Sequence, residues 1–145
     1  MSFYGQYQHS LDAKGRVIIP AKYREELGEN FMMTHGLDKN IYIYPMERWE
    51  KIVERVSQIP MTDKQGRKFV RFLFSNAVSC SADKQGRVVV DSHLRDYAEL
   101  DKDVTIIGSL DKAEIWDTAR FNADCEDVDD DPDIFSAAVS EKYGI

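Results

Sequence analysis

The chain contains two copies of one segment in the same order, and this internal duplication limits its possible folds more than any other feature. A shift of 71 residues places residues 12–19 on residues 83–90, with a glycine, an arginine and a β-branched run in register. A shift of 72 then aligns residues 36–49 with residues 108–121. One inserted residue explains the change of shift, so the sequence predicts two modules of one design.

Each copy predicts the same short elements: a strand, a glycine turn, a second strand, a short helix and two further strands. In the first copy Gly15 can adopt a positive φ in the turn, and Pro20 has the fixed φ of a first helical position. Gly28 provides a common type of helix end. The expected strands are residues 6–10, 16–19, 31–34, 41–44, 78–81, 87–90, 104–107 and 114–116, and the expected short helices are residues 21–27 and 92–100.

Between the two copies, the spacing of apolar residues changes from that of a strand to that of a helix. Pro60 separates two helical stretches, and Thr62 with Gln65 forms a capping-box pattern at the start of the second. The apolar face of the first stretch is Trp49, Ile52, Val53, Val56 and Ile59, and that of the second is Phe69, Phe72 and Leu73. The sequence therefore predicts a helical hairpin between the modules.

Together these patterns predict an α+β protein of two tandem β-hairpin modules. The first module is assigned to residues 5–49 and the second to residues 76–121. Residues 50–75 form the helical linker, and residues 122–145 form an acidic tail. A weaker amphipathic pattern at residues 134–143 indicates one more helix, which gives the tail a partly helical character.

The formal net charge of −7 belongs to the tail. Residues 122–145 carry eight acidic residues and one lysine, so the acidic and basic residues of the remaining chain balance. Local charge is a better guide to a binding face than the total, and the total therefore does not exclude a nucleic-acid partner. We interpret the run at residues 124–133 as a solvated linker. A further hypothesis is that the tail screens the basic turns at residues 12–16 and 83–87 from non-specific DNA.

The duplicated turn reads D-A-K-G-R at residues 12–16 and D-K-Q-G-R at residues 83–87. A short β-hairpin of this type is a compact probe, because a two-stranded ribbon fits the DNA major groove. Arg16 and Arg87 are the candidate readers, since a guanidinium can hold guanine O6 and N7 together. Lys14 and Lys84 would add phosphate contacts.

Asp12 and Asp83 lie four positions before the arginines and could organise the turns or orient the arginines. The same pattern has a purely structural interpretation, in which each Asp–Arg pair only holds the fold. The string itself is weak evidence, because D-K-Q-G-R also occurs at residues 63–67. There the next residues have helical spacing, so we assign that copy to the start of a helix.

No pattern in the sequence predicts an enzyme, a cofactor, a metal or a small-molecule substrate. The histidines His9, His35 and His93 are not spaced as metal ligands, and no nucleophile motif or phosphate-binding glycine loop is present. Cys80 and Cys125 form no redox or metal motif. No apolar run is long enough to cross a bilayer and no secretory signal is present, so a cytoplasmic protein is expected.

The stretch Y-Q-H-S-L-D-A-K-G-R-V-I-I-P-A-K-Y-R, residues 7–24, resembles the opening of MraZ proteins. Residues 80–90, C-S-A-D-K-Q-G-R-V-V-V, are similar to the second repeat of that family, and F-V-R-F-L-F-S at residues 69–75 resembles the helix before it. The resemblance covers roughly residues 3–121 and includes a D-x-x-x-R motif in both halves.

The resemblance implies two swapped-hairpin modules of the SpoVT/AbrB type around a small pseudo-two-fold, β-barrel-like core. It further implies a nucleoid-associated transcriptional regulator, normally a repressor, at the promoter of the division and cell-wall gene cluster. Family members form homo-oligomeric rings that bind short direct repeats in double-stranded DNA through the motif arginines, here Arg16 and Arg87. An interaction scaffold that uses this fold without DNA is the main alternative.

The two copies differ beside the motif. Asp91 stands where the first copy has Pro20, and Asp91 or Ser92 could cap the following helix. Because Asp91 adds a negative charge, we expect the second loop to be the less basic one. The subunit contacts of a ring need exposed apolar surface, to which four aromatic residues could contribute unless they belong to the core: Tyr23, Phe31, Tyr42 and Tyr44.

Overall fold

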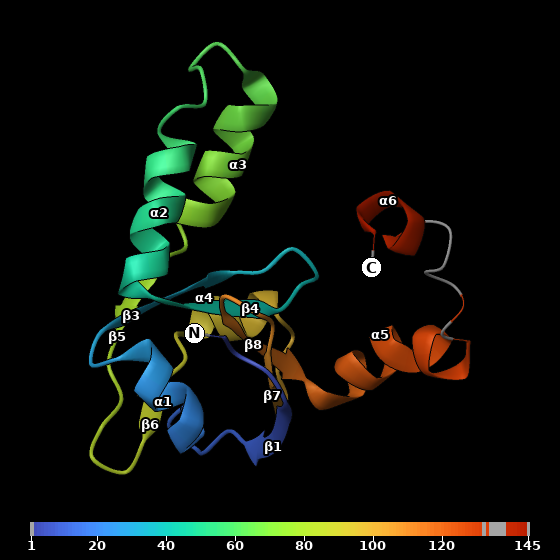
Figure 1. The fold of residues 1–145 in the computed structure, drawn as a ribbon. Helices are drawn as coiled ribbons and strands as arrows, with labels where there is room; N and C mark the ends of the chain where they lie inside the picture. Colours follow the sequence, from blue (N-terminus) through green and yellow to red (C-terminus); the bar gives the residue numbers. More distant parts are fainter. Residues whose placement is uncertain (1, 132, 134–138, 145) are drawn as a thin grey trace.

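The computed structural model describes residues 2–131, 133 and 139–144 (Figure 1). The first repeat contains β1 (Gln6–Ser10), β2 (Arg16–Ile18), α1 (Ala21–Leu27), β3 (Phe31–His35) and β4 (Ile41–Pro45). The second repeat contains β5 (Val78–Cys80), β6 (Arg87–Val89), α4 (Ser92–Tyr97), β7 (Asp103–Gly108) and β8 (Ala113–Asp117). The helices α2 (Met46–Val56) and α3 (Lys64–Phe74) join the repeats, and α5 (Thr118–Asp130) and α6 (Glu141–Tyr143) come after them. Every expected strand is confirmed to within one residue at each end, whereas the helix expected at residues 92–100 ends earlier, at Tyr97.

The strands form one six-stranded antiparallel sheet and a separate two-stranded ribbon. The sheet has the order β1-β7-β8-β4-β3-β5, and the ribbon pairs β2 with β6. Each repeat places its first strand beside the other repeat, since β1 pairs with β7 and β5 pairs with β3. Equivalent strands therefore occur in the same order from either edge of the sheet, which fits a tandem duplication.

The prediction of a local hairpin in each repeat is wrong in one respect. The two strands beside the turn do not pair with each other, as β1 and β2 show in the first repeat. The backbone N–H of Asp12 donates to Arg16 O at 2.9 Å and closes the turn, but no ladder continues from it. The two strands leave the turn for different sheets. Local sequence could not reveal this, because the turn has the same chemistry whichever strand its neighbours pair with. The swapped pairing of β2 with β6 agrees with the arrangement implied by the family resemblance, whereas the six-stranded sheet has β1 and β5 at its two edges and does not show a closed barrel among the described residues.

Equivalent residues of the two repeats meet in the main core. Ile19 and Val90 are fully buried, as are Tyr23 and Leu94. Burial of one such side chain stabilises the fold by about 1.5–3 kcal/mol. The Tyr23 hydroxyl donates to Tyr4 O at 2.7 Å and Gly5 O at 2.9 Å, which satisfies its polar atom.

Three of the aromatic residues considered for subunit contacts belong instead to the buried interior of this chain. Tyr23, Phe31 and Tyr44 are all buried, while Tyr42 is partly exposed. Tyr23 and Phe31 lie in the main core, and Tyr44 packs in a second cluster with Trp49 and Leu73. The strand pattern could not separate these roles, because both faces of β3 and β4 are largely covered.

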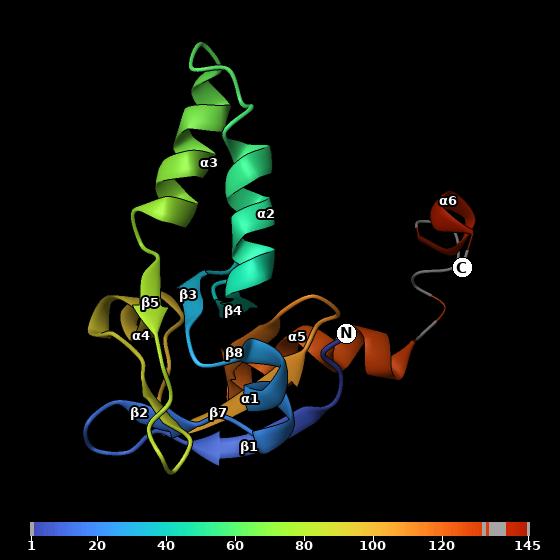
Figure 2. The same ribbon diagram turned by 60° about the vertical axis from the view of Figure 1, so that its left-hand side comes forward.

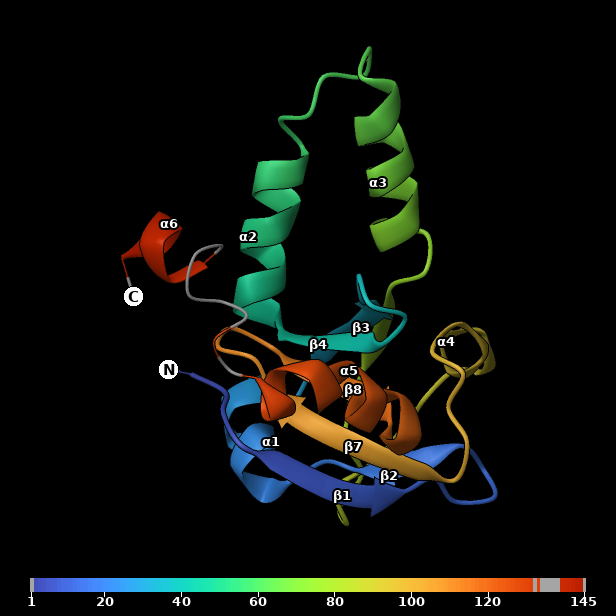
Figure 3. The ribbon, with the colours of Figure 1, turned by 90° about the vertical axis from the view of Figure 1, so that its right-hand side faces the viewer.

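The helices α2 and α3 form the expected hairpin, which stands away from the sheet (Figure 3). Trp49 and Leu73 anchor its base beside Tyr44. The helix α3 is capped by Asp63 and not by Thr62, since Asp63 Oδ1 accepts the Gly66 N–H at 3.1 Å. The assignment of residues 63–67 to a helix start is thus confirmed, but its cap lies one residue later than the capping-box pattern predicts.

The acidic run is not a solvated linker throughout, because α5 extends through it to Asp130. Asp117 caps this helix by accepting the Arg120 N–H at 3.3 Å. The helix α5 contacts β7 and β8, and the shift of 72 makes it the counterpart of α2. It runs away from the two duplicated loops (Figure 1). The boundary expected after residue 121 falls inside α5, and the helix expected at residues 134–143 lies partly outside the described residues.

Candidate nucleic-acid interface

The first duplicated loop is organised by the carboxylate of Asp12. Its Oδ1 accepts the backbone N–H groups of Lys14 and Arg16, each at 2.9 Å. Its Oδ2 accepts Arg16 Nε at 2.7 Å. Gly15 has a φ of +73°, a conformation in which a side chain is strained. One carboxylate therefore fixes both the turn and the direction of the arginine.

The second loop repeats this geometry. Asp83 Oδ1 accepts the N–H groups of Gln85 and Arg87, each at 2.9 Å, and its Oδ2 accepts Arg87 Nε at 2.8 Å. Gly86 has a φ of +81°. The two loops thus share one internal arrangement, although only three of their five positions carry the same residue.

Hydrogen bonds keep both aspartates ionised. The backbone N–H of Arg16 is the largest cause that lowers the pKa of Asp12 below its usual 3.8, and that of Arg87 does the same for Asp83. A hydrogen bond donated to a carboxylate favours its charged form. Each arginine is therefore held by a charged partner at neutral pH.

Within the described chain, each arginine donates hydrogen bonds from its side chain only through Nε. The side chain of Arg16 is 23% exposed and that of Arg87 is 34% exposed. Their Nη atoms have no hydrogen-bond partner among the described residues, so the four N–H donors on these two nitrogens are available to a ligand on each side chain. A planar fork with free donors suits bidentate recognition of guanine or phosphate.

Lys14 and Lys84 are exposed on the same two loops. Neither ammonium forms an ion pair or a hydrogen bond with any residue that the structure describes. The two lysines occupy neighbouring and not equivalent turn positions, so they extend from their loops at different points. Both add positive charge next to the arginines.

The β2–β6 ribbon brings the loops together at one end of the molecule. The N–H of Ile19 donates to Gly86 O, and the N–H of Val90 donates to Gly15 O, both at 2.9 Å. Each loop is therefore bonded to the strand end of the other repeat. Both loops lie opposite the tip of the α2–α3 hairpin (Figure 2). The sequence predicted the loops but not the bond of each loop to the strand end of the other repeat.

Sequence reasoning missed two arginines that cover the loop glycines. Arg24 lies on α1 and contacts Gly86, so that a Cβ there would lie 2.7 Å from Arg24 Cζ. Arg95 lies on α4 and covers Gly15 in the same way. Arg24 Nε donates to Ile19 O at 3.0 Å, and Arg95 Nη1 donates to Val90 O at 2.6 Å.

The signal that could have found this pair is the shift of 71, which aligns Arg24 with Arg95. A basic residue kept at equivalent positions of two diverged copies stands out once the alignment is extended into the short helices. With these two residues, six basic side chains surround the loops: Lys14, Arg16, Arg24, Lys84, Arg87 and Arg95.

Asp91, which we expected to affect the second loop, also lies close in sequence to a strand end that contacts the first loop. Val90 bonds to Gly15 of the first loop, and Asp91 is the next residue in the chain. Because the ribbon crosses between repeats, the backbone of Asp91 follows a strand end that is bonded to the first loop. Asp91 occupies the cap position of α4 but makes no side-chain capping hydrogen bond.

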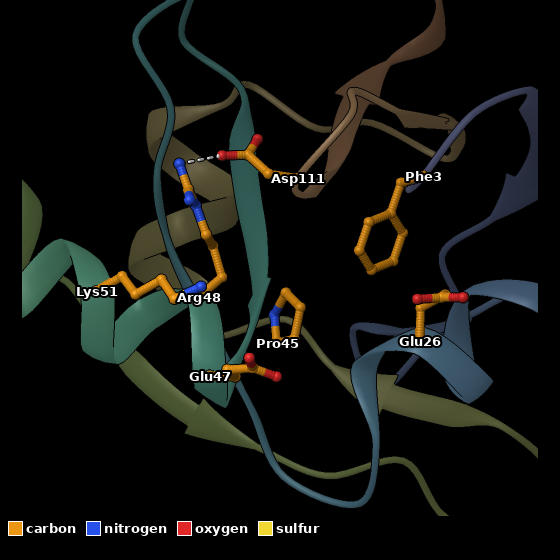
Figure 4. A pocket seen from close by; sticks show the side chains of 7 residues that line it. All are labelled: Phe3, Glu26, Pro45, Glu47, Arg48, Lys51 and Asp111. Atoms are coloured by element: carbon orange, nitrogen blue, oxygen red, sulfur yellow. Dashed lines mark ion pairs between the residues drawn. The ribbon is translucent and has the colours of Figure 1, made fainter. Parts of the chain in front are cut away.

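A pocket of about 360 Å³ lies on another part of the surface (Figure 4). Its acidic and basic side chains are mixed, and Arg48 Nη2 pairs with Asp111 Oδ2 at 2.8 Å. It is lined by Phe3, Glu26, Pro45, Glu47, Arg48, Lys51 and Asp111. The described residues contain no group of side chains that could hold a metal ion. None of their helices has the length and apolar character needed to cross a membrane.

Comparison with known proteins places the chain in a family. The chain matches the family model described as "MraZ protein, putative antitoxin-like" twice, over residues 2–72 and 73–133. It is 44% identical to the "Transcriptional regulator MraZ" of Halothermothrix orenii over 139 residues, which are 96% of this chain and 97% of that protein. The protein of the same name from Acetivibrio thermocellus is 46% identical over 143 residues, covering 99% and 97%. That of Caldanaerobacter subterraneus is 51% identical over 112 residues, covering 77% and 78%.

Proposed function

The chain belongs to the MraZ family, and we propose that it is a transcriptional regulator that binds double-stranded DNA through its two D-x-x-x-R loops. Arg16 and Arg87 contact base edges, and Lys14 and Lys84 contact phosphates. Asp12 and Asp83 orient the arginines. The function is binding and not catalysis, and it needs no cofactor.

The observation that carries this proposal is the repeated arrangement of the two loops. In each loop a charged aspartate holds Arg Nε and leaves the Nη donors free. The ribbon presents both arginines at one end of the molecule, where it also gathers four further basic side chains. A duplicated structural turn would share this geometry, so the proposal also depends on the free guanidinium edges and on the basic side chains gathered on the same face. The acidic α5 runs away from this face, so the net negative charge does not oppose DNA binding there.

We further propose that the protein acts as a homo-oligomeric ring on short direct repeats. The promoter would be that of the division and cell-wall gene cluster, with repression as the outcome and the nucleoid as the location. One loop pair supplies few contacts, but several linked pairs on repeated boxes raise the apparent affinity by about 10²–10⁴ through effective concentration. A partly exposed apolar groove at the base of the α2–α3 hairpin, which includes Leu37, Tyr42 and Phe69, could serve as a subunit contact.

A mobility-shift titration on the DNA upstream of the chain's own gene tests the function. The Arg16→Ala plus Arg87→Ala variant is expected to lose the specific shift while its melting temperature stays close to that of the wild type. The wild-type affinity should fall steeply with salt, because phosphate contacts release counterions. Retained specific binding would show that the loops are not the DNA-binding site. A large fall in melting temperature would favour the purely structural role of the Asp–Arg pairs.

The alternative function is that of an interaction scaffold that does not bind DNA. It predicts that the wild type shows no specific shift on the upstream region at any salt concentration. Footprinting of the same region distinguishes the two functions, since only a DNA-binding protein protects spaced boxes.

A further inference from the structure

The solvent-facing side of the β2–β6 ribbon carries four side chains in a fixed pattern. The register pairs Arg16 with Val89 and Ile18 with Arg87. Since side chains alternate along a strand, the middle pair, Val17 and Val88, points into the core. The other four side chains therefore share the opposite face, with the arginines on one diagonal and the β-branched residues on the other.

Ile18 and Val89 are exposed although their neighbours in the strands are buried. Ile18 is 45% exposed and Val89 is 51% exposed, whereas Val17 is only 1% exposed. Single exposed apolar residues need no explanation. These two, however, occupy equivalent positions under the shift of 71, and each lies directly across the ribbon from the motif arginine of the other repeat.

We propose that Ile18 and Val89 contact the 5-methyl groups of thymines next to the bases read by Arg87 and Arg16. This inference rests on the proposed DNA-binding function and adds a base preference to it. Each half of the ribbon face selects a thymine beside a guanine, because an apolar side chain and an arginine are presented together. Ile18 and Val89 are then specificity-determining residues and not merely exposed core residues.

The geometry of duplex DNA fits this assignment. The thymine methyl group projects into the major groove, which admits a two-stranded ribbon, and apolar side chains are its usual contacts. Residues opposite each other in an antiparallel pair have Cβ atoms about 4.5–5.5 Å apart, against a base-pair rise of about 3.4 Å. An arginine and its cross-strand neighbour can therefore reach adjacent base pairs.

Charge decides which partner fits the face. The two β-branched side chains lie between two guanidinium groups, and Lys14 and Lys84 extend from the flanking loops. A protein partner with an apolar patch would bury the free Nη donors of the two arginines and would bring no acceptor for them or for the lysines, which is costly. Double-stranded DNA offers phosphates to the basic side chains and methyl groups to the apolar ones.

The test measures how strongly binding depends on single thymine methyl groups. The probe is the upstream duplex that the wild type protects in a footprint, with each thymine in the protected boxes replaced in turn by deoxyuridine, which lacks the methyl group. Loss of one buried methyl group is worth about 0.8 kcal/mol, so the wild-type affinity should fall about fourfold at the contacted thymines. It should be unchanged at the others.

Variants of the two apolar side chains, combined with the deoxyuridine duplexes, complete the test. Ile18→Ala should weaken binding to the normal duplex and make it insensitive to deoxyuridine at one set of thymines, and Val89→Ala should do so at a different set. Val53→Ala is the matched control, because it truncates an exposed apolar residue on α2 away from the ribbon. It should keep the full response to deoxyuridine.

Two outcomes would overturn the inference while leaving the proposed function in place. In one, the wild type binds thymine and deoxyuridine duplexes equally at every position but still needs Arg16 and Arg87. In the other, Ile18→Ala and Val89→Ala change the oligomer mass on size-exclusion chromatography and keep the full deoxyuridine response, which makes the face a subunit contact. A wild type without any specific shift would instead refute the proposed function itself.

Discussion

The string D-x-x-G-R occurs three times in this chain and adopts two structures. At residues 83–87 and 12–16 it forms a loop in which the aspartate accepts two backbone N–H groups and the arginine Nε. At residues 63–67 the aspartate instead caps α3 through one backbone N–H, that of Gly66. There Arg67 turns back and donates Nη1 to Met61 O at 2.8 Å.

The difference comes from the residues on the C-terminal side of the string and not from the string itself. After Arg67 the apolar residues recur at helical spacing, and Phe74 at the end of α3 packs against Trp49 of α2. After Arg87 a run of valines enters β6 and pairs with β2 of the other repeat. Secondary-structure preference is weak compared with tertiary contacts. An identical pentapeptide thus forms the duplicated loop only where the following strand pairs with a strand of the other repeat. The copy at the start of α3 provides an internal control for the loops.

The largest expected contrast is in DNA binding. Arg87→Ala removes a free guanidinium from the loop face and should cost about 1–3 kcal/mol of binding free energy, as expected for a bidentate base contact. Arg67→Ala removes the same side chain from the same pentapeptide at the far tip of the helical hairpin and should leave the affinity unchanged. Titrated mobility shifts at one salt concentration measure both. Equal losses would mean that the arginines act only as general positive charge.

The next contrast concerns the glycines. Gly86→Ala places a Cβ at a φ of +81° and against Arg24, so it should destabilise the protein by at least about 1–2 kcal/mol. Gly66→Ala meets the side chain of Ile59, but it gains about 1 kcal/mol of helix propensity in α3. Urea denaturation should therefore show the smaller loss for Gly66→Ala. A reversed order would show that the helix start is the more constrained of the two structures.

A smaller effect is expected on the unfolding free energy when the pH is lowered. The folded-state pKa values of Asp12 and Asp83 are lowered, so the stabilisation that they provide is complete above their unfolded value. It is lost as the pH falls from about 3.8 through the lowered folded values. Asp12→Asn plus Asp83→Asn should therefore flatten the dependence of the unfolding free energy on pH in this acid range. Urea denaturation between pH 7 and pH 3 measures the slope, and an unchanged slope would contradict the hydrogen-bond assignment.

The smallest contrast lies between the two loops. Asp91 is the residue after Val90, which bonds to the first loop, so Arg16→Ala should reduce DNA affinity slightly less than Arg87→Ala. The difference should stay below about 1 kcal/mol, as for other exposed charge pairs, and should shrink as salt screens it. Paired titrations at low and high salt measure it. A larger effect of Arg16→Ala at low salt would show that Asp91 does not act on the first loop.

Sequence reasoning predicted the repeats, the strands and the helical hairpin, because these depend on local spacing and turn chemistry. It did not predict which strands pair, since β2 reaches β6 across 71 residues and nothing in either strand specifies that partner. The six expected site residues do lie together on the two loops. Arg24 and Arg95 were missed because each contacts a glycine of the other repeat, and a side chain in a short helix shows no sign of such a contact.

The reciprocal cover of the loop glycines has a consequence for synthesis of the chain. During translation the first loop emerges early, but Val90, whose N–H donates to Gly15 O, and Arg95, which covers that glycine, are made about eighty residues later. Contacts of such long sequence separation form late in folding. A ribosome-bound first half therefore lacks the bonds that complete its loop, and the DNA binding that we propose would begin only when nearly the whole protein has been made. Neither repeat can be replaced without altering the loop of its neighbour, so the two halves are constrained to diverge together.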